Sequence, residues 1–529
     1  MGRSAAPRTL QLRMGRVPGR FYGPSCFVAF RADPHPLAIA STRSGNGPET
    51  VTRGMEMRIK FHVVAACGAA LFVLAACGGG SGNGSGSTGG NTTGGASGST
   101  LSLAAQVGQK AFFDQTLSGG KDMSCASCHS PQYAYGPPNS LAVQLGSDSA
   151  QSGVRAVPTL RYKDATPPYN DNAANPDGVT LPSAGGGFML DGRAPTLAAQ
   201  PELPLLNPIE MNNASKDVVV QAVKSGSYAD LFKQAFGANV FDDTGAAFTA
   251  LGQAIQAYEQ EDLSFHPYTS KYDLYVHNKL GGTLTAAERR GLINFNTGDI
   301  GNCSACHYGG VNFNGNQGLM TDFTYQAIGA PRNDSSIPGN PDPIPANDKD
   351  PTYYDMGLCG PYRTDHAPGS PGFETSDQYC GQFKVPTLRN VATRSAFFHN
   401  GVFHSLGQVV HFYNTRDTNP EYWYPNSGGS GTPVDNPDYA LQPTYVPGAK
   451  LQIFNDLPTA FQGNVDEEVP LGTGIGGDNT LGGGTQPRSP GSKPSMSDQD
   501  IADVVCFLNT LTDGYQIPDT PPTSGACVN

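Results

Sequence analysis

Apolar residues recur at helical spacing in two stretches of the chain. Across residues 497–516 they fall on one helical face, made of Ile501, Val504, Val505, Leu508 and Leu511. Ser497 stands before this stretch as a candidate N-cap residue. Residues 246–260 predict a comparable helix, while alternating runs that would build a sheet are scarce and Gly, Pro and Asn abound elsewhere. The pattern predicts a mainly α protein with long irregular loops.

A different apolar run lies near the start of the chain, at residues 61–76, after Arg58 and Lys60. It is shorter than the roughly 20 residues that a bilayer span needs, and its positive flank is typical of a secretory signal. It ends in Leu-Ala-Ala-Cys at Cys77, which resembles a bacterial lipobox and predicts cleavage and lipidation there. Ordinary signal cleavage that leaves Cys77 uninvolved is the alternative.

Composition and charge separate these leading segments from the rest. Residues 1–56 carry eight arginines and no lysine without an apolar period, so we expect a non-native extension with translation starting at Met55 or Met57. Residues 78–100 are rich in Gly, Ser and Thr, as in a flexible tether. The net charge is −12 overall and +7 over residues 1–76, which leaves −19 for the remainder. So acidic an exported chain is a poor nucleic-acid binder.

Two pentapeptides of the form C-x-x-C-H carry the chemistry. Their residues are Cys125, Cys128 and His129 in the first copy, and Cys303, Cys306 and His307 in the second. In an exported protein this motif indicates covalent haem c, with two thioether bonds and a histidine placed to bind iron. A zinc or redox C-x-x-C site is the alternative.

The surroundings of the two motifs also match. Gly108 and Phe112 precede the first copy as Gly291 and Phe295 precede the second, and Thr285 begins a predicted capping box before the second. We therefore expect two haem c groups in two cytochrome-c-like domains. The predicted segments are an extension (1–56), a lipoprotein signal (57–77), a linker (78–100), a first haem domain (101–275), a second haem domain (276–516) and a tail (517–529).

Four further cysteines suit disulfides in an oxidising compartment. Nearness in sequence favours Cys359 with Cys380 and Cys506 with Cys527, although the sequence leaves other pairings open.

Longer stretches at residues 191–211 (DGRAPTLAAQPELPLLNPIEM), 270–292 and 383–406 resemble the bacterial di-haem cytochrome c peroxidases. The resemblance covers most of residues 101–515. It implies that the haem held by His129 reacts with hydrogen peroxide and that the haem held by His307 takes and stores electrons. It also implies that Glu210 moves protons in a distal pocket lined by Gln200 and Pro204. For Glu210 alone, a solvated surface acid or a helix N-terminal charge is the alternative.

The chain departs from the typical family pattern at both irons. No histidine lies between His129 and His266, so the usual distal histidine is missing and we expect an open first haem at rest. Tyr413 stands where typical members have a methionine ligand of the second haem, as in the MauG-like branch, which oxidises a partner-protein side chain. The alternative makes Tyr413 a core residue and Met356 the ligand.

Other family positions are altered as well. Leu190 replaces a tryptophan common between the haems, and the chain's one tryptophan is Trp423. Ala156 replaces an asparagine that binds Ca²⁺ in relatives, which leaves carbonyls near Pro386 as the remaining candidates. His399 matches a position near the second haem.

Two functions stay open at this point. The first is a peroxidase that reduces hydrogen peroxide with electrons from a small redox protein or from the side chain of an exported partner protein. The alternative is a non-enzymatic di-haem electron-transfer cytochrome c. In either case we expect a periplasmic, outer-membrane or cell-surface protein that meets the membrane only through a lipid on Cys77.

Overall fold

The computed structural model describes residues 101–173, 183–309, 318–371, 377–466, 489–520 and 522–529. The chain divides into two units, Met1–Asn91 and Thr92–Asn529, and all described residues belong to the second. The predicted extension, signal segment, lipid site and linker therefore lie outside the described residues. Within the described part, no helix has both the length and the apolar character that a bilayer crossing requires.

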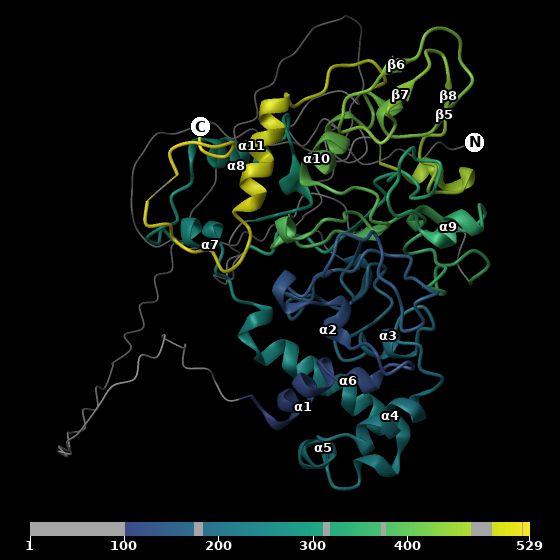
Figure 1. Cartoon of the computed structure of the whole chain (residues 1–529), viewed down its shortest axis with the longest axis vertical. Coiled ribbons are helices and arrows are strands. Elements are labelled where there is room, and N and C mark those ends of the chain that lie inside the picture. Colours follow the sequence, from purple (N-terminus) through teal and green to yellow (C-terminus); the bar gives the residue numbers. More distant parts are fainter. Residues whose placement is uncertain (1–100, 174–182, 310–317, 372–376, 467–488, 521) are drawn as a thin grey trace, which may run out of the picture. The chain divides into compact units, whose positions relative to one another are not determined.

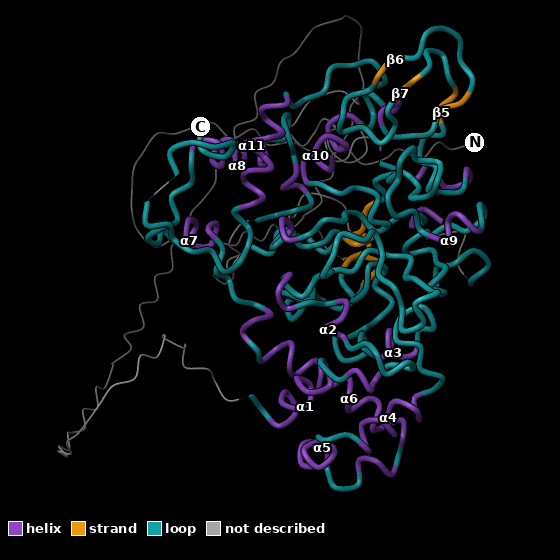
Figure 2. Tube along the Cα trace, viewed as in Figure 1, coloured by secondary structure: helices purple, strands orange, loops and turns teal. Residues whose placement is uncertain are grey.

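Helices connected by long loops make up this second unit, as Figure 2 shows. The helices are α1 (Leu103–Phe112), α2 (Cys125–Cys128), α3 (Glu202–Leu206), α4 (Lys216–Ser225), α5 (Ala229–Phe236), α6 (Thr244–Glu261), α7 (Lys271–Val276), α8 (Ala286–Asn296), α9 (Pro345–Lys349), α10 (Leu406–Thr415) and α11 (Asp498–Asn509). In Figure 1, α1, α4, α5 and α6 gather in one part of the unit, and α7, α8 and α11 in another. The predicted mainly α class is confirmed.

Strands are few and short among the described residues. They form four antiparallel pairs: β1 (Asn170–Ala173) with β2 (Ser183–Gly185), β3 (Tyr325–Gln326) with β4 (Phe383–Lys384), β5 (Asn426–Ser427) with β8 (Lys450–Leu451), and β6 (Val434–Asp435) with β7 (Thr444–Tyr445). Gly185 of β2 also bridges to Thr324, next to β3, so β-type pairing links the two halves of the sequence.

One close helix crossing organises each half of the chain. In the first half α1 packs on α6, and a Cβ atom at Gly108 would overlap the carbonyl oxygen of Ala254. In the second half α8 packs on α11, and a Cβ atom at Gly291 would overlap the carbonyl oxygen of Asp503. The matching glycines seen in the sequence are thus the points where two backbones approach too closely for any side chain.

An aromatic contact accompanies each crossing. Phe112 of α1 meets Tyr258 of α6 edge to face at 5.7 Å between ring centroids. Phe295 of α8 meets Phe507 of α11 in the same manner at 5.1 Å. Each half therefore repeats one arrangement, in which a helix with a central glycine and a following phenylalanine leads toward a C-x-x-C-H motif.

The predicted helix starts are confirmed. Thr285 and Glu288 form a reciprocal capping box at the start of α8, and Ser497 and Asp500 form another at the start of α11. On the predicted apolar face of α11, Ile501, Val504, Leu508 and Leu511 are buried, and Val505 packs half-buried against them. Burial of this face against α8 stabilises the second half.

Main-chain hydrogen bonds join the two halves along a seam. The N–H of Lys384 donates to the carbonyl of Leu190 at 2.9 Å, and the N–H of Ala156 donates to the carbonyl of His399 at 2.7 Å. Both predicted disulfides, Cys359–Cys380 and Cys506–Cys527, are present. The first closes a loop of the second half, and the second fastens the C-terminal segment to α11.

Replacing Gly108 with alanine should destabilise the first half, because the added methyl group forces α1 away from the backbone of α6. We expect Gly108→Ala to lower the free energy of unfolding by about 1–3 kcal/mol, the usual cost of overpacking. Denaturant unfolding followed by circular dichroism measures this change. Gly463→Ala is the matched control, since a Cβ atom there meets nothing within 4 Å. Equal stability of the two variants would contradict the close crossing.

Candidate active site

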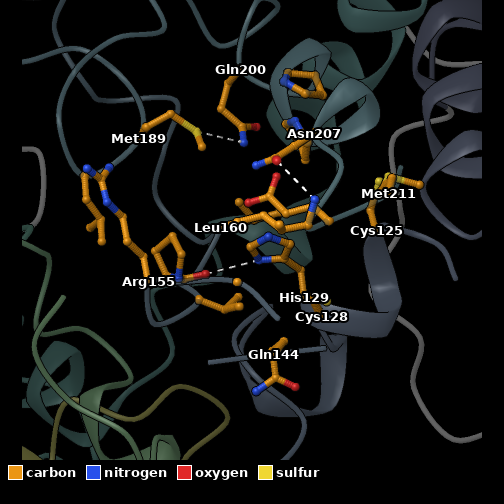
Figure 3. A pocket seen from close by; sticks show the side chains of 18 of the residues that line it. Cys125, Cys128, His129, Gln144, Arg155, Leu160, Met189, Gln200, Asn207 and Met211 are labelled. Carbon is orange, nitrogen blue, oxygen red and sulfur yellow. Dashed lines mark hydrogen bonds between the residues drawn. The ribbon is translucent and has the colours of Figure 1, made fainter. Parts of the chain in front are cut away.

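The first C-x-x-C-H motif lies on one wall of a buried cavity. Its cysteines are the first and last residues of α2, and His129 follows as the C-cap residue. The Nδ1 atom of His129 lies 3.2 Å from the carbonyl oxygen of Tyr135 and 3.1 Å from that of Pro158. An N–H at Nδ1 donating to these carbonyls leaves Nε2 free as a ligand atom. Figure 3 shows the ring of His129 with Cys128 beside it.

The second motif is built in the same manner. Cys303 begins the short 3₁₀ turn Cys303–Ala305, and Cys306 and His307 follow it on the wall of a second cavity. The Nδ1 atom of His307 lies 3.0 Å from the carbonyl oxygen of Met320, and the Pro386 carbonyl accepts a second bond from the ring. The Pro386 carbonyl, expected as a candidate calcium ligand, is therefore already a hydrogen-bond acceptor of His307.

Both sites fit covalent haem c. Burial lowers the pKa of His129 and of His307 to about 4, which keeps each imidazole in the neutral form that binds iron. None of the four motif cysteines forms a disulfide, whereas Cys359, Cys380, Cys506 and Cys527 are paired in disulfides. Most of the surface that lines each of the two cavities is apolar. Cysteines outside disulfides, a fixed neutral imidazole and apolar walls are what a thioether-linked haem requires.

The predicted distal residues Glu210, Gln200 and Pro204 line the same cavity as His129. Gln200 approaches from the segment before α3, where its amide Nε2 donates to the Met189 sulfur at 3.5 Å, as drawn in Figure 3. The fold thus brings residues that lie 71 to 81 positions after His129 in the sequence into one pocket with it. Glu210 is not a solvated surface acid, because its side chain lines this buried cavity.

The carboxyl group of Glu210 is poised as an acid–base group. Its Oε2 atom is buried and has no hydrogen-bond partner among the described residues. Burial raises the pKa of Glu210, while Arg193 and a hydrogen bond from Asn207 counteract part of that rise. A carboxyl oxygen without a fixed partner is free to receive and return a proton from a bound molecule.

Arg193 is itself held by a fully buried carboxylate. Asp191 accepts from Arg193 at 2.6 Å and from Arg155 at 2.8 Å, and the two guanidinium groups hold the pKa of Asp191 below its usual value, although burial opposes them. Arg155 also binds Asp355 of the second half through two nitrogens, at 2.6 and 2.7 Å. The distal side of the first cavity is thereby anchored to both halves of the chain.

Among the described residues that line the first cavity, His129 is the single histidine. Leu190, Ala156 and Pro158 line both cavities, so Leu190 stands in the wall between them, at the place that the family resemblance gave to a tryptophan.

Tyr413, on α10, lines the second cavity together with His307 and both motif cysteines. Burial raises the pKa of its phenol, with the neighbouring Cys306 adding to the rise, and Phe398 meets the ring edge to face at 5.5 Å. The alternative ligand Met356 is not among the residues that line this cavity and packs against the core of the second half instead. Of the two candidates, the structure places Tyr413 with His307.

Several residues of the site were missed from the sequence. Arg193 and Asn207 lie within the stretch 191–211 that carries the family resemblance, so the sequence could have pointed to them. Tyr362 also lines the first cavity, but it belongs to the second half, and no motif near it predicts that contact. The two tyrosines that follow the first motif have different surroundings. Tyr135 is buried and stacks on Phe265, and Tyr133 lines the second cavity. His399 lines the second cavity as expected and bonds Asp456 at 3.1 Å.

Several known proteins are similar to this chain in sequence. The sequence model of the family described as di-haem cytochrome c peroxidase matches residues 102–280. The methylamine utilization protein MauG of Paracoccus denitrificans is 33% identical over 315 residues, which cover 59% of this chain and 74% of that protein. The cytochrome c551 peroxidase of Pseudomonas aeruginosa is 28% identical, with coverage of 58% and 70%.

Solved structures agree with these relatives. The diheme peroxidase BthA of Burkholderia thailandensis superposes with a TM-score of 0.62 at 34% identity, covering 78% of this chain and 86% of that chain. A tyrosine-to-methionine variant of BthA gives the same TM-score at 35% identity. The chain belongs to the di-haem cytochrome c peroxidase family, and it is a peroxidase with two haem c groups.

Proposed function

We propose that this enzyme reduces hydrogen peroxide to two molecules of water in the first cavity, with electrons that arrive through the second. The observation that carries the proposal is the buried, unpartnered Oε2 atom of Glu210 in the cavity of His129. The two haems, held by Cys125, Cys128 and His129 and by Cys303, Cys306 and His307, supply the irons that bind peroxide and exchange electrons. The electron-carrier alternative gives no role to a buried distal acid and is not favoured.

Glu210 acts on the protons of peroxide. Cleavage of the O–O bond requires one proton to leave the near oxygen and one to reach the departing oxygen, and a single carboxylate at Oε2 performs both transfers in turn. The amide of Gln200 orients the bound peroxide, and the ring of Pro204 excludes water from the same wall. Arg193 favours the ionised carboxylate that must accept the first proton.

We propose that Tyr413, together with His307, would bind the iron of the second haem. Its place in the cavity of His307 supports this assignment, as does the absence of Met356 from that lining among the described residues. A phenolate oxygen is a hard anionic donor that stabilises oxidised iron, so it sets a low reduction potential. A low potential suits an enzyme that stores oxidising equivalents at this site.

We propose that the electrons come from a small redox protein or from a side chain of an exported partner protein. MauG, a relative at 33% identity, carries the name of a methylamine utilization protein. Calcium is not part of the proposal, because Ala156 replaces the expected asparagine and the Pro386 carbonyl accepts from His307.

We also propose that the enzyme works outside the cytoplasm, in the periplasm or at the outer membrane or cell surface, with a lipid on Cys77 as its only membrane attachment. The support is the apolar run at residues 61–76, the lipobox-like end at Cys77 and the tether that follows.

Replacing Glu210 with glutamine should leave both haems attached but slow peroxide cleavage by about 10²–10⁴-fold, the usual cost of losing a positioned acid–base group. Stopped-flow mixing with hydrogen peroxide measures the rate. Because the ionised carboxylate is needed and burial raises its pKa, the wild-type rate should fall as pH drops through that raised pKa. The variant should lose this pH dependence. A variant with the wild-type rate would remove Glu210 from the mechanism.

Replacing Tyr413 with histidine should keep two axial ligands on the second iron but raise its midpoint potential, because neutral imidazole stabilises the oxidised iron less than phenolate does. Spectroelectrochemical titration measures the potential. Tyr422→Phe, outside the cavity lining, is the control and should leave the potential unchanged. A wild-type enzyme with the long-wavelength absorption band of methionine ligation would refute the assignment.

Replacing Cys77 with serine should release the protein from membranes, since the lipid is proposed to be attached to that sulfur. Expression in a lipoprotein-processing bacterium with labelled palmitate, followed by membrane fractionation, tests this expectation. Wild-type protein should carry label and sediment with membranes, while the Cys77→Ser protein should do neither. Unlabelled, membrane-free wild-type protein would show that Cys77 is not lipidated.

A further inference from the structure

Three cationic side chains line the second cavity without a carboxylate partner. They are Lys163 of the first half, and Lys384 and Arg394 of the second half. No Asp or Glu oxygen among the described residues lies within the 4.0 Å of an ion pair from any of them. Each of these side chains is half-buried.

Buried arginines elsewhere in this unit are paired with carboxylates. Arg389 pairs with Asp273 at 2.8 Å, and Arg416 pairs with Asp417 at 2.7 Å. Arg155 binds two carboxylates. Because removing a cation from water is unfavourable unless an anion compensates it, buried cations in proteins are paired. In the lining of the second cavity, by contrast, Lys163, Lys384 and Arg394 have no carboxylate partner.

These three cations are held in place from the first half of the chain. The Nη1 atom of Arg394 donates to the carbonyl of Val157 at 2.7 Å, and the Nζ atom of Lys384 donates to the carbonyl of Gly187. Lys163 belongs to the first half itself. Their carbonyl partners carry no net charge, so the bonds orient the cations without neutralising them.

The group that Cys303 and Cys306 bind carries two carboxylates. A haem attached through its vinyl carbons has its two propionates on the opposite edge of the ring, away from the thioether bonds. We propose that Lys163, Lys384 and Arg394 form the binding site for the propionates of the second haem, so that a lysine of the first half holds the haem of the second half.

The electrostatic surroundings support an anion at this place. Burial lowers the pKa of Lys163 to about 8 and that of Arg394 to about 10, and burial together with Lys163 lowers the pKa of Lys384. The titratable groups that face the three cations from neighbouring segments are the acids Glu259 of α6 and Asp191 and the neutral imidazole of His129. None of the three forms an ion pair with them, and two propionates would restore the missing negative charge.

The test uses the purified di-haem enzyme and three variants, Lys163→Gln, Lys384→Gln and Arg394→Gln. Haem content is measured first and should remain two per chain, because the thioether bonds are untouched. The midpoint potential of the second haem is then measured against pH. Loss of a neighbouring cation should raise a propionate pKa by about one to three units, from below the ordinary carboxyl range into the measured range.

We expect each Gln variant to give a steeper dependence of potential on pH than the wild type around neutral pH, and Lys163→Arg to restore the wild-type profile. Redox-difference infrared spectra should show the shifted carboxylate bands in the Gln variants. Lys279→Gln, an exposed change, should match the wild type. Gln variants whose pH profiles and carboxylate bands coincide with the wild type would overturn the proposal.

A comparison with Glu259→Gln tests whether Lys163 binds a propionate or Glu259. If Lys163→Gln shifts only bands that also change in Glu259→Gln, Lys163 serves Glu259 and the propionate site is overturned for that lysine. The inference rests on the second haem and not on Glu210 or the identity of the reductant. Failure of peroxide cleavage in Glu210→Gln and failure of the propionate test are therefore distinguishable.

Discussion

The ion pairs of Arg155 are the interaction on which the two-cavity arrangement depends. One guanidinium group binds Asp355 of the second half through two nitrogens and Asp191 of the first half through a third. Asp191 is fully buried and also holds Arg193, whose charge acts on Glu210. Removing one partner from so buried a cluster costs about 3–5 kcal/mol, because the remaining charges are left without compensation. The same cluster thus fixes the seam between the halves and the electrostatics of the distal acid.

Within each half, a second constraint gives each motif its position. The glycine crossings bring α1 onto α6 and α8 onto α11 at backbone contact, and the aromatic pairs beside them set the helix faces. Each motif histidine is then oriented by main-chain carbonyls and not by a side chain. Carbonyl acceptors leave the histidine ring neutral and add no charge near it. The two cavities therefore differ in charge because of the other residues that line them.

Local and repeated features could be predicted from the sequence. The capping box at Thr285, the N-cap at Ser497 and the two disulfides each depend on residues close together in the chain, and each is confirmed. The matching glycines were visible as a repeat, although each meets a backbone far away in the sequence. The gathering of Glu210, Gln200 and Pro204 around His129 came from a family motif.

What the sequence could not reveal depends on contacts between distant segments. Lys163 reaches the cavity of His307 because it closely follows Ala156 and Pro158, which line both cavities, and nothing near Lys163 in the chain signals that position. Arg155 meets Asp355 across 200 residues, and Tyr362 reaches the first cavity from the second half for the same reason. Periodicity and motifs describe neighbours along the chain, whereas the seam is set by tertiary packing alone.

The two cavities differ in the charges that they present, and this difference explains how one chain divides the reaction. The first cavity contains a carboxylic acid whose free oxygen exchanges protons, beside arginines that are already neutralised by Asp191 and Asp355. The described lining of the second cavity includes four cationic side chains and two tyrosines but no acid. In the proposed function, protons are therefore handled in the first cavity and electrons pass through the second. Leu190 in the wall between them has no aromatic ring, so this position offers no side chain through which an electron could hop from one site to the other.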